Sequence, residues 1–229
     1  MAEIHGPKVV RDGLVLNLDA ADKTSYPGSG TTWLDKSGYA NNGTLTNGPT
    51  FSSGNGGSIV FDGTNDFVLV NTAASIPTGA TARTVSIWFY TNPSTWTADV
   101  NNLFQYGGNV TRTSFGIDFS TYPVMQVWTY ADDITFSTSF AQTGWKNITV
   151  TYNGATTILV YENGSFTQTK TLGAVLNTTV TNVWIGSVNP AVTAGFFIGS
   201  IATTQIYNRA LSAQEIQQNY NATKTRFGL

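Results

Sequence analysis

Hydrophobic and polar residues alternate along most of this 229-residue chain, a pattern typical of β-strands with one buried face. Between residues 84 and 91, Val85, Ile87 and Phe89 share one face, and Trp88 and Tyr90 share the other. A similar alternation predicts a first strand at residues 14–19. Further strands are predicted at residues 58–61, 67–70, 103–106, 115–119, 124–130, 134–137, 147–152, 157–162, 165–169, 183–186, 196–198 and 201–207.

Turn sequences separate several of these strands. Asn153-Gly154 and Asn163-Gly164 lie between the three strands of residues 147–169. Because Asn-Gly supplies the positive φ angles of a tight hairpin turn, these strands are predicted to form a meander. The strands at residues 58–61 and 67–70 flank the turn at residues 62–66, which predicts another hairpin.

One helix is expected, at the C-terminal end of the chain. Ser212 and Glu215 have the spacing of a capping box, in which each side chain bonds the backbone of the other. Ile216 and Tyr220, four residues apart, would then face the sheet. The helix is predicted from Ser212 to about Ala222. The expected fold class is all-β: one domain, a two-sheet antiparallel sandwich with one short C-terminal helix.

The composition excludes several classes of protein. Charged residues make up 10% of the chain, the net charge is −2 and no run of one sign occurs, so nucleic-acid binding is not expected. The chain has no cysteine, which excludes disulfides, thiolate metal sites and cysteine catalysis. Its one histidine, His5, lies next to the N-terminus, so a histidine-based triad or a multi-histidine metal site is excluded too.

The sequence shows no recognisable export or membrane segment. Residues 1–10 include Glu3 and Lys8 and lack the apolar run of a secretory signal. Residues 183–202 carry no charge, but Asn189-Pro190 and three glycines favour two strands joined by a turn over a membrane span. We therefore expect a protein that folds in a reducing cytoplasm and does not span a membrane.

Several motifs resemble those of laminin-G-like, concanavalin-A-like jelly-roll domains. The motifs are Gly13-Leu14-Val15-Leu16, Leu18-Asp19-Ala20, Trp33-Leu34-Asp35-Lys36-Ser37-Gly38, Asn41-Asn42-Gly43-Thr44-Leu45, Phe61-Asp62-Gly63-Thr64-Asn65-Asp66-Phe67-Val68, Ile206-Tyr207-Asn208-Arg209-Ala210-Leu211-Ser212 and Glu215-Ile216. The resemblance implies a jelly-roll sandwich at residues 13–223, with an N-terminal arm at residues 1–12 and a C-terminal tail at residues 224–229.

A narrower resemblance concerns two segments. The loop Tyr26-Pro27-Gly28-Ser29-Gly30 and the ending Arg226-Phe227-Gly228-Leu229 are similar to virion structural proteins of tailed bacteriophages. That resemblance implies a non-catalytic structural or interaction protein of the virion, namely an exterior decoration, fibre or tail-associated subunit made in the host bacterial cytoplasm. The implied partners are other virion proteins and copies of the chain itself. Low charge favours a homo-oligomer, since contact between copies buries little charge; the alternative is a monomer kept soluble by hydroxyl and amide groups.

Two other functions stay open for such a fold. One is a lectin-like adhesin for a host surface polysaccharide, which could coexist with a virion role. The other is a glycoside hydrolase, which needs two carboxylates about 5–10 Å apart. The Glu-x-Asp-x-x-Glu strand of laminarinase-like hydrolases is absent, and the only glutamates are Glu3, Glu162 and Glu215. No strand alternates a pair of carboxylates, so the protein is not expected to be an enzyme.

A carbohydrate site would combine an aromatic platform with amide and carboxylate groups. Trp96 and Asn101 lie in one predicted loop, and Tyr130 precedes Asp132 and Asp133 in another. The alternative for both aromatic residues is the core or a contact between subunits. Most other aromatic residues are assigned to the core between the sheets; examples are Trp88, Phe89, Phe115, Trp145 and Trp184.

Calcium is the one cofactor to consider. Asp62 and Asp66 bracket a turn and could contribute oxygen ligands, but a calcium ion takes about six to eight of them. Many relatives carry an acidic residue after the isoleucine at position 201, where this chain has Ala202. The alternative is that these turn residues bond turn amides.

Overall fold

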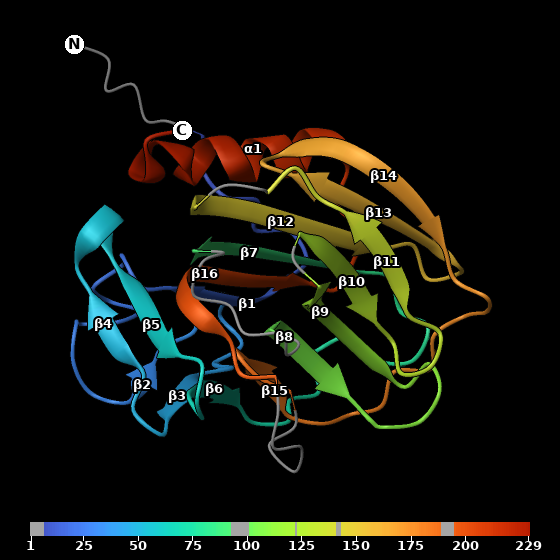
Figure 1. The fold of residues 1–229 in the computed structure, drawn as a ribbon, viewed down its shortest axis with the longest axis horizontal. Helices are drawn as coiled ribbons and strands as arrows, with labels where there is room; N and C mark the ends of the chain where they lie inside the picture. Colours follow the sequence, from blue (N-terminus) through green and yellow to red (C-terminus); the bar gives the residue numbers. More distant parts are fainter. Residues whose placement is uncertain (1–6, 93–100, 122, 141–142, 189–194) are drawn as a thin grey trace.

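Two antiparallel β-sheets pack face to face and form the body of the molecule (Figure 1). The computed structural model describes residues 7–92, 101–121, 123–140, 143–188 and 195–229. Sheet A has the order β14-β13-β12-β7-β16-β5-β4, and β1 joins it by pairing with β16. Sheet B has the order β11-β10-β9-β8-β15-β6-β3-β2. The predicted all-β, two-sheet antiparallel jelly-roll sandwich is confirmed.

The elements have the following bounds. Sheet A contains β1 (Leu14–Asp19), β4 (Thr50–Ser52), β5 (Ser58–Asp62), β7 (Arg83–Thr91), β12 (Gly144–Tyr152), β13 (Thr157–Glu162), β14 (Ser165–Thr171) and β16 (Ile198–Tyr207). Sheet B contains β2 (Thr32–Trp33), β3 (Gly43–Thr46), β6 (Phe67–Val70), β8 (Asn101–Gly107), β9 (Ser114–Thr121), β10 (Val124–Trp128), β11 (Ile134–Ser137) and β15 (Val183–Ile185). The helical elements are η1 (Gly54–Gly56), α1 (Ala213–Thr223) and η3 (Lys224–Phe227).

The core lies between the sheets, and the alternation along each strand decides which side chains enter it. Val85, Ile87 and Phe89 of β7 belong to this core, as predicted, and are fully buried. Trp88 points to the opposite, outer face of sheet A, where it packs against Phe227. The inward positions of both sheets form one continuous apolar cluster.

The assignment of aromatic residues to this core is right for some and wrong for others. Phe89 and Phe115 lie in it. Trp88 and Trp145 instead belong to a separate cluster on the outer face of sheet A. Trp184 occupies the outward position of β15, since its two neighbours both point into the core. Period-two alternation separates the two faces of a strand, but it does not show whether the outer face is covered as well.

The hairpin predicted around residues 62–66 is not formed. β5 pairs with β4 and β16 in sheet A, whereas β6 pairs with β3 and β15 in sheet B. The turn therefore carries the chain from one sheet to the other. Both strands bury a face in the same core, so their sequence pattern is the same in a hairpin and in this crossover.

The meander of β12, β13 and β14 is confirmed. Asn163 and Gly164 both have positive φ angles, 50° and 76°, as a tight two-residue turn requires. The other connection is longer, and only Gly154 in it has a positive φ, 86°. There the Asn153 side chain closes the loop by accepting a hydrogen bond from the amide of Thr157 at 3.0 Å.

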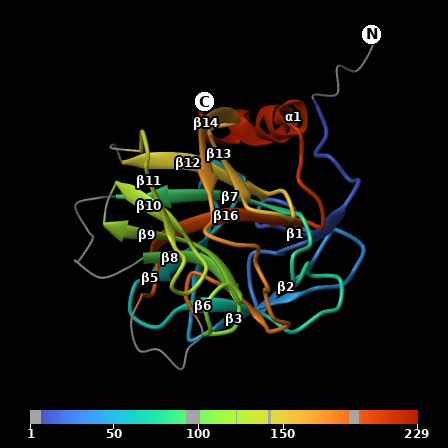
Figure 2. The same ribbon diagram turned by 90° about the vertical axis from the view of Figure 1, so that its right-hand side faces the viewer.

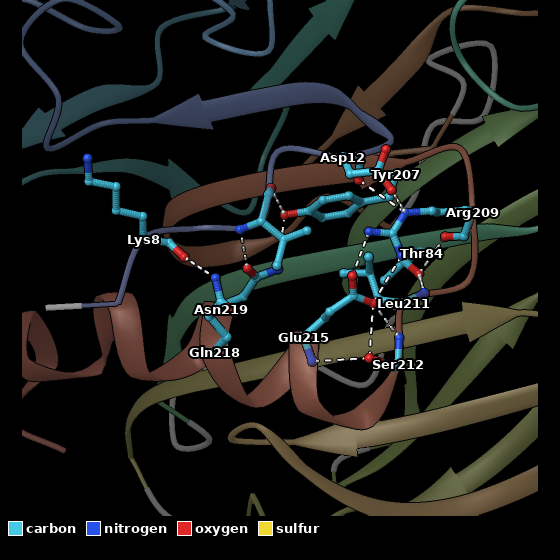
Figure 3. Close-up of polar contacts among 11 residues, drawn as sticks. Lys8, Asp12, Thr84, Tyr207, Arg209, Leu211, Ser212, Glu215, Gln218 and Asn219 are labelled. Carbon is cyan, nitrogen blue, oxygen red and sulfur yellow. Dashed lines mark hydrogen bonds and ion pairs between the residues drawn. The ribbon is translucent and has the colours of Figure 1, made fainter.

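Helix α1 begins with the predicted capping box. Ser212 Oγ accepts a hydrogen bond from the amide of Glu215, and the Glu215 carboxylate accepts one from the amide of Ser212 at 2.9 Å (Figure 3). The helix lies against the outer face of sheet A, beside β14 (Figures 1 and 2). Ile216 is buried there, and the Tyr220 ring stacks on Trp88 with 5.4 Å between centroids.

The chain after α1 continues across the same face of sheet A. Phe227 of η3 stacks on Trp88 with 4.2 Å between ring centroids, and Arg226 makes an ion pair of 2.9 Å with Asp19. The residues set apart as a C-terminal tail thus pack on the sheet as far as Phe227. The described part of the N-terminal arm, residues 7–12, is hydrogen-bonded to α1.

Candidate ligand-binding surface

Three of the predicted sugar-binding residues lie together in the turn between β10 and β11. Tyr130 has a positive φ of 64° and is 37% exposed. The amide of Thr129 donates to Asp133 Oδ1 at 2.7 Å, which holds that carboxylate across the turn. Arg112 Nε donates to Asp132 Oδ2 at 2.6 Å and ties the turn to the loop between β8 and β9. The turn presents one aromatic ring beside two held carboxylates.

Trp128, the last residue of β10, extends this surface and was missed in the sequence. Its ring centroid lies 5.9 Å from that of Tyr130, with the planes tilted by 50°. Met125 and Val127 point into the core, so Gln126 and Trp128 face outward, where both are half-buried. The alternation of residues 124–128 is the signal that could have identified them. We call Gln126, Trp128, Tyr130 and Asp133 the β10 surface.

A buried carboxyl group adjoins the β10 surface. Asp118 of β9 is the register partner of Gln126 and is only 1% exposed. Burial raises the pKa of Asp118 to about 8; a hydrogen bond with Gln126 opposes this effect, and the charge of Asp133 adds to it. At neutral pH, Asp118 is therefore mostly an uncharged acid. It was missed because its relation to Asp133 runs across strands rather than along one.

The three glutamates do not assemble into a catalytic pair among the described residues. Glu162 is 6% exposed and accepts hydrogen bonds from the amide and hydroxyl of Ser139. Glu215 is occupied by the cap of α1 and by Arg209, whose guanidinium lies 2.7 Å away. Glu3 lies outside the described residues. Both described glutamates thus have structural partners.

Asn101 does not join the β10 surface, which corrects its placement in a loop. It is the first residue of β8, is 4% exposed, and accepts a hydrogen bond from the amide of Ile198 at 3.3 Å. In sheet B, Asn101 pairs with Phe119 near one end of β9. Trp128 pairs with Gly116 near the other end, so Asn101 lies away from the β10 surface. Pairing with β9 extends the strand beyond its hydrophobic run. Trp96 lies outside the described residues.

The two aspartates of the calcium hypothesis bond turn amides. Asp62 Oδ1 accepts from the amide of Thr64 at 2.7 Å, and Asp66 Oδ2 accepts from the amide of Asp62 at 3.1 Å. Burial raises the pKa of Asp66. Within the described ranges, no three or more acidic or histidine side chains gather as metal ligands would. A calcium site at Asp62 and Asp66 stays a prediction.

A family model matches the sequence over most of the sandwich. The model of the concanavalin A-like lectin/glucanase superfamily matches residues 62–217, more than half of the chain. The chain belongs to this superfamily. The laminin-G-like, concanavalin-A-like resemblance of its motifs is thereby confirmed.

Solved structures share the fold of this superfamily member. The binding domain of botulinum neurotoxin DC in complex with rat synaptotagmin II matches with a TM-score of 0.70 and 15% identity, over 93% of this chain and 52% of that one. The binding domain of Paraclostridial Mosquitocidal Protein 1 gives 0.70 and 19%, over 93% and 52%. The botulinum neurotoxin serotype D ligand-binding domain in complex with N-acetylneuraminic acid gives 0.69 and 14%, over 92% and 51%.

These likenesses show a shared fold, and the chain spans about half the length of the structures it matches. No curated protein sequence matches it. In the described part of this superfamily member, no helix has the length and apolar character needed to cross a membrane.

Proposed function

We propose that this chain is a non-catalytic, lectin-like binding module that takes up a glycan on its β10 surface. The Trp128–Tyr130 pair carries the proposal, because both rings are partly exposed and their centroids lie 5.9 Å apart. Aromatic faces pack on the apolar face of a sugar ring, while amide and carboxylate groups bind its hydroxyls. Gln126 and Asp133 supply those polar groups.

The burial and hydrogen bonding of the carboxyl groups near the β10 surface favour binding over hydrolysis. Hydrolysis needs one ionised and one protonated carboxyl group at a set separation. Asp118 is only 1% exposed, and Asp133 already accepts a backbone hydrogen bond. Two structural neighbours are binding domains in complex with a protein and with a sialic acid, respectively, which supports a binding role without naming the ligand.

A glycan array with matched variants tests this proposal. We expect Trp128→Ala and Tyr130→Ala each to weaken binding about tenfold, the usual cost of removing a central aromatic contact. Tyr39→Ala is the control, because Tyr39 is 56% exposed and lies outside the β10 surface. Unchanged binding by both folded variants would overturn the proposal. Release of sugar from a polysaccharide, abolished by Asp118→Asn, would show catalysis instead.

The proposal assigns this module to the outside of a tailed-bacteriophage particle, as a decoration, fibre or tail-associated subunit. Its support is the sequence resemblance together with the low charge: 11 basic and 13 acidic residues for 9546 Å² of surface. Such a surface meets a neighbouring protein with little desolvation of charge. Antibody labelling of purified particles is expected to locate the chain on head or tail, and its absence from them would contradict this assignment.

A second candidate function, contact with a protein neighbour or another copy, is favoured by a group of exposed apolar side chains. Val110, Val175 and Val180 are 65%, 45% and 58% exposed. Their loops are hydrogen-bonded to one another, through Arg112 and Thr113 to residues 177 and 179. If this group joins copies of the chain, Val110→Asp and Val180→Asp reduce the sedimentation coefficient of the oligomer, and a monomeric wild-type protein excludes contact between copies.

A further inference from the structure

A hollow of about 400 Å³ lies on the outer face of sheet A near the C-terminal end of α1. Asn17 of β1 and Gln205 of β16, which pair in register, contribute to its lining from the sheet. The rest comes from the N-terminal segment at residues 7–11, the ends of β1 and α1, the loops after β1 and β2, and η3. The hollow therefore belongs to the opposite sheet from the β10 surface.

Hydrogen bonds hold the N-terminal segment in position at this hollow. Gln218 Nε2 of α1 donates to the carbonyl of Lys8 at 2.7 Å, and the Val10 amide donates to Asn219 Oδ1 at 2.8 Å. In Figure 3 the Lys8 side chain points away from the helix, so its ammonium group is not used in this attachment. Arg11 bonds the carbonyl of Lys36 at 2.8 Å and links this segment to the loop after β2.

Positive charge is concentrated here in a chain that is otherwise poor in charge. Four of the 11 basic and two of the 13 acidic residues line the hollow, which gives it a net charge of +2 against −2 for the whole chain. Arg226 is neutralised by Asp19. Lys8, Arg11 and Lys36 make no ion pair with any described residue. Lys8 and Arg11 thus line the hollow with no ion-pair partner among the described residues, and Lys36 shares it with the carboxylate of Asp22.

The remaining lining can bind hydroxyl groups. Asn17 Oδ1 accepts from Gln205 Nε2 at 3.1 Å, which leaves Asn17 Nδ2 and Gln205 Oε1 without a partner among the described residues. Asp22 is mostly ionised at neutral pH: burial raises its pKa, but hydrogen bonds from Thr24 and the charge of Lys36 lower it overall. None of the described residues that line the hollow is aromatic. A neutral sugar would therefore find no stacking platform, and recognition would depend on charge.

We propose that this hollow binds a sugar acid of monosaccharide size. Its carboxylate lies among Lys8, Arg11 and Lys36, and its hydroxyls bond Asn17, Gln205 and Asp22. The volume of about 400 Å³ falls at the small end of ligand pockets, which span about 300–1,000 Å³. This site shares no residue with the β10 surface, so its test is independent of the test of the proposed function.

Calorimetric titration with three probes tests the chemistry. At low ionic strength we expect D-galacturonate to bind, D-galactose to bind at least tenfold more weakly, and inorganic phosphate also to bind more weakly because it lacks the ring hydroxyls. Salt is expected to weaken the galacturonate complex, since mobile ions screen charges over about 10 Å at 0.1 M. Equal binding of galactose would overturn the role of charge, and equal or tighter binding of phosphate would overturn the sugar assignment.

Variants connect that binding to the hollow. Lys8→Met and Lys36→Met are each expected to weaken galacturonate binding about tenfold, as expected for loss of a charge-assisted hydrogen bond. Lys23→Met is the matched control, because Lys23 is an exposed lysine outside the lining. Lys8 is exposed and is held through its backbone, so this variant should keep the wild-type melting temperature. Wild-type affinity in a folded Lys8→Met variant would refute the proposed site.

Discussion

Both sheets carry outward-pointing tryptophans in their strands, and two of these, Trp88 of sheet A and Trp128 of sheet B, differ in whether the end of the chain covers them. On sheet A, Trp88 is 3% exposed, lies 4.2 Å from the ring of Phe227, and donates its indole N–H to Thr223 Oγ1 at 2.9 Å. On sheet B, Trp128 stays half-buried beside Tyr130. Its indole N–H makes no hydrogen bond within the described ranges.

The difference separates the structural role of Trp88 from the binding role that we propose for Trp128. The N–H of a buried tryptophan usually finds a hydrogen-bond partner, and Thr223 is that partner for Trp88. A half-exposed aromatic pair keeps apolar surface available to another molecule, which is what a recognition surface requires. The same residue type at outward positions thus stabilises the fold on sheet A and stays partly exposed on sheet B, where we propose that it binds a ligand.

The largest expected effect is the difference in stability lost when Trp88 or Trp128 is replaced by alanine. Trp88→Ala should lower the free energy of unfolding by about 3–5 kcal/mol, because it empties the space between sheet A and the C-terminal segment. Trp128→Ala should cost about 1 kcal/mol, since the side chain is already half-exposed. Urea denaturation measures both values. Equal losses would mean that the two faces are equally structural.

A second prediction concerns the buried acid on sheet B. Asp118 has a raised pKa of about 8 against an ordinary value of 3.8, so between these values the folded state holds a proton that the unfolded chain has lost. Asp118 therefore makes stability fall as pH rises through this window. The slope for one such group is about 1.4 kcal/mol per pH unit.

Asp118→Asn removes this titration and nearly preserves the side-chain shape. Between pH 5 and 7, the stability of the wild type relative to the variant should fall by about 2–3 kcal/mol. Urea denaturation at several pH values gives the difference curve, in which the other titrating groups cancel. A flat difference curve would mean that Asp118 is ionised in the folded protein.

Much of the fold could be predicted because its signals are local. The cap of α1 depends on Ser212 and Glu215, three residues apart, and the tight turn depends on Asn163 and Gly164. Strand pairing is not local in this way. The crossover at residues 62–66 and the cover over Trp88, formed by residues more than a hundred positions later, depend on tertiary packing that alternation cannot encode.

The residues of the candidate site also differ in whether local sequence could predict them. Tyr130, Asp132 and Asp133 could be proposed together because they are nearly contiguous in one turn. Arg112 and Asp118 reach that region from other strands and loops, so only the structure could reveal them. Asn101 was misplaced for the opposite reason, since pairing with β9 makes it part of a strand.

The smallest predicted effect concerns the interactions of Glu215 that hold the start of α1 on the outer face of sheet A. Arg209 is the main cause that lowers the pKa of Glu215 to about 2 from an ordinary value of 4.5, by donating two hydrogen bonds to the carboxylate; burial opposes the shift, and Ser212 adds to it (Figure 3). Because the folded pKa is depressed, this stabilisation is complete above about pH 4.5 and is lost as pH falls to about 2. Glu215→Gln should therefore cost about 1–2 kcal/mol at pH 7, after allowance for solvent screening, and little near pH 2.

Ser212→Ala is the control: its hydroxyl does not titrate, so its cost of about 1 kcal/mol should persist at both pH values. Equal costs of Glu215→Gln at pH 7 and pH 2 would mean that the cap, rather than the charge, holds the start of the helix.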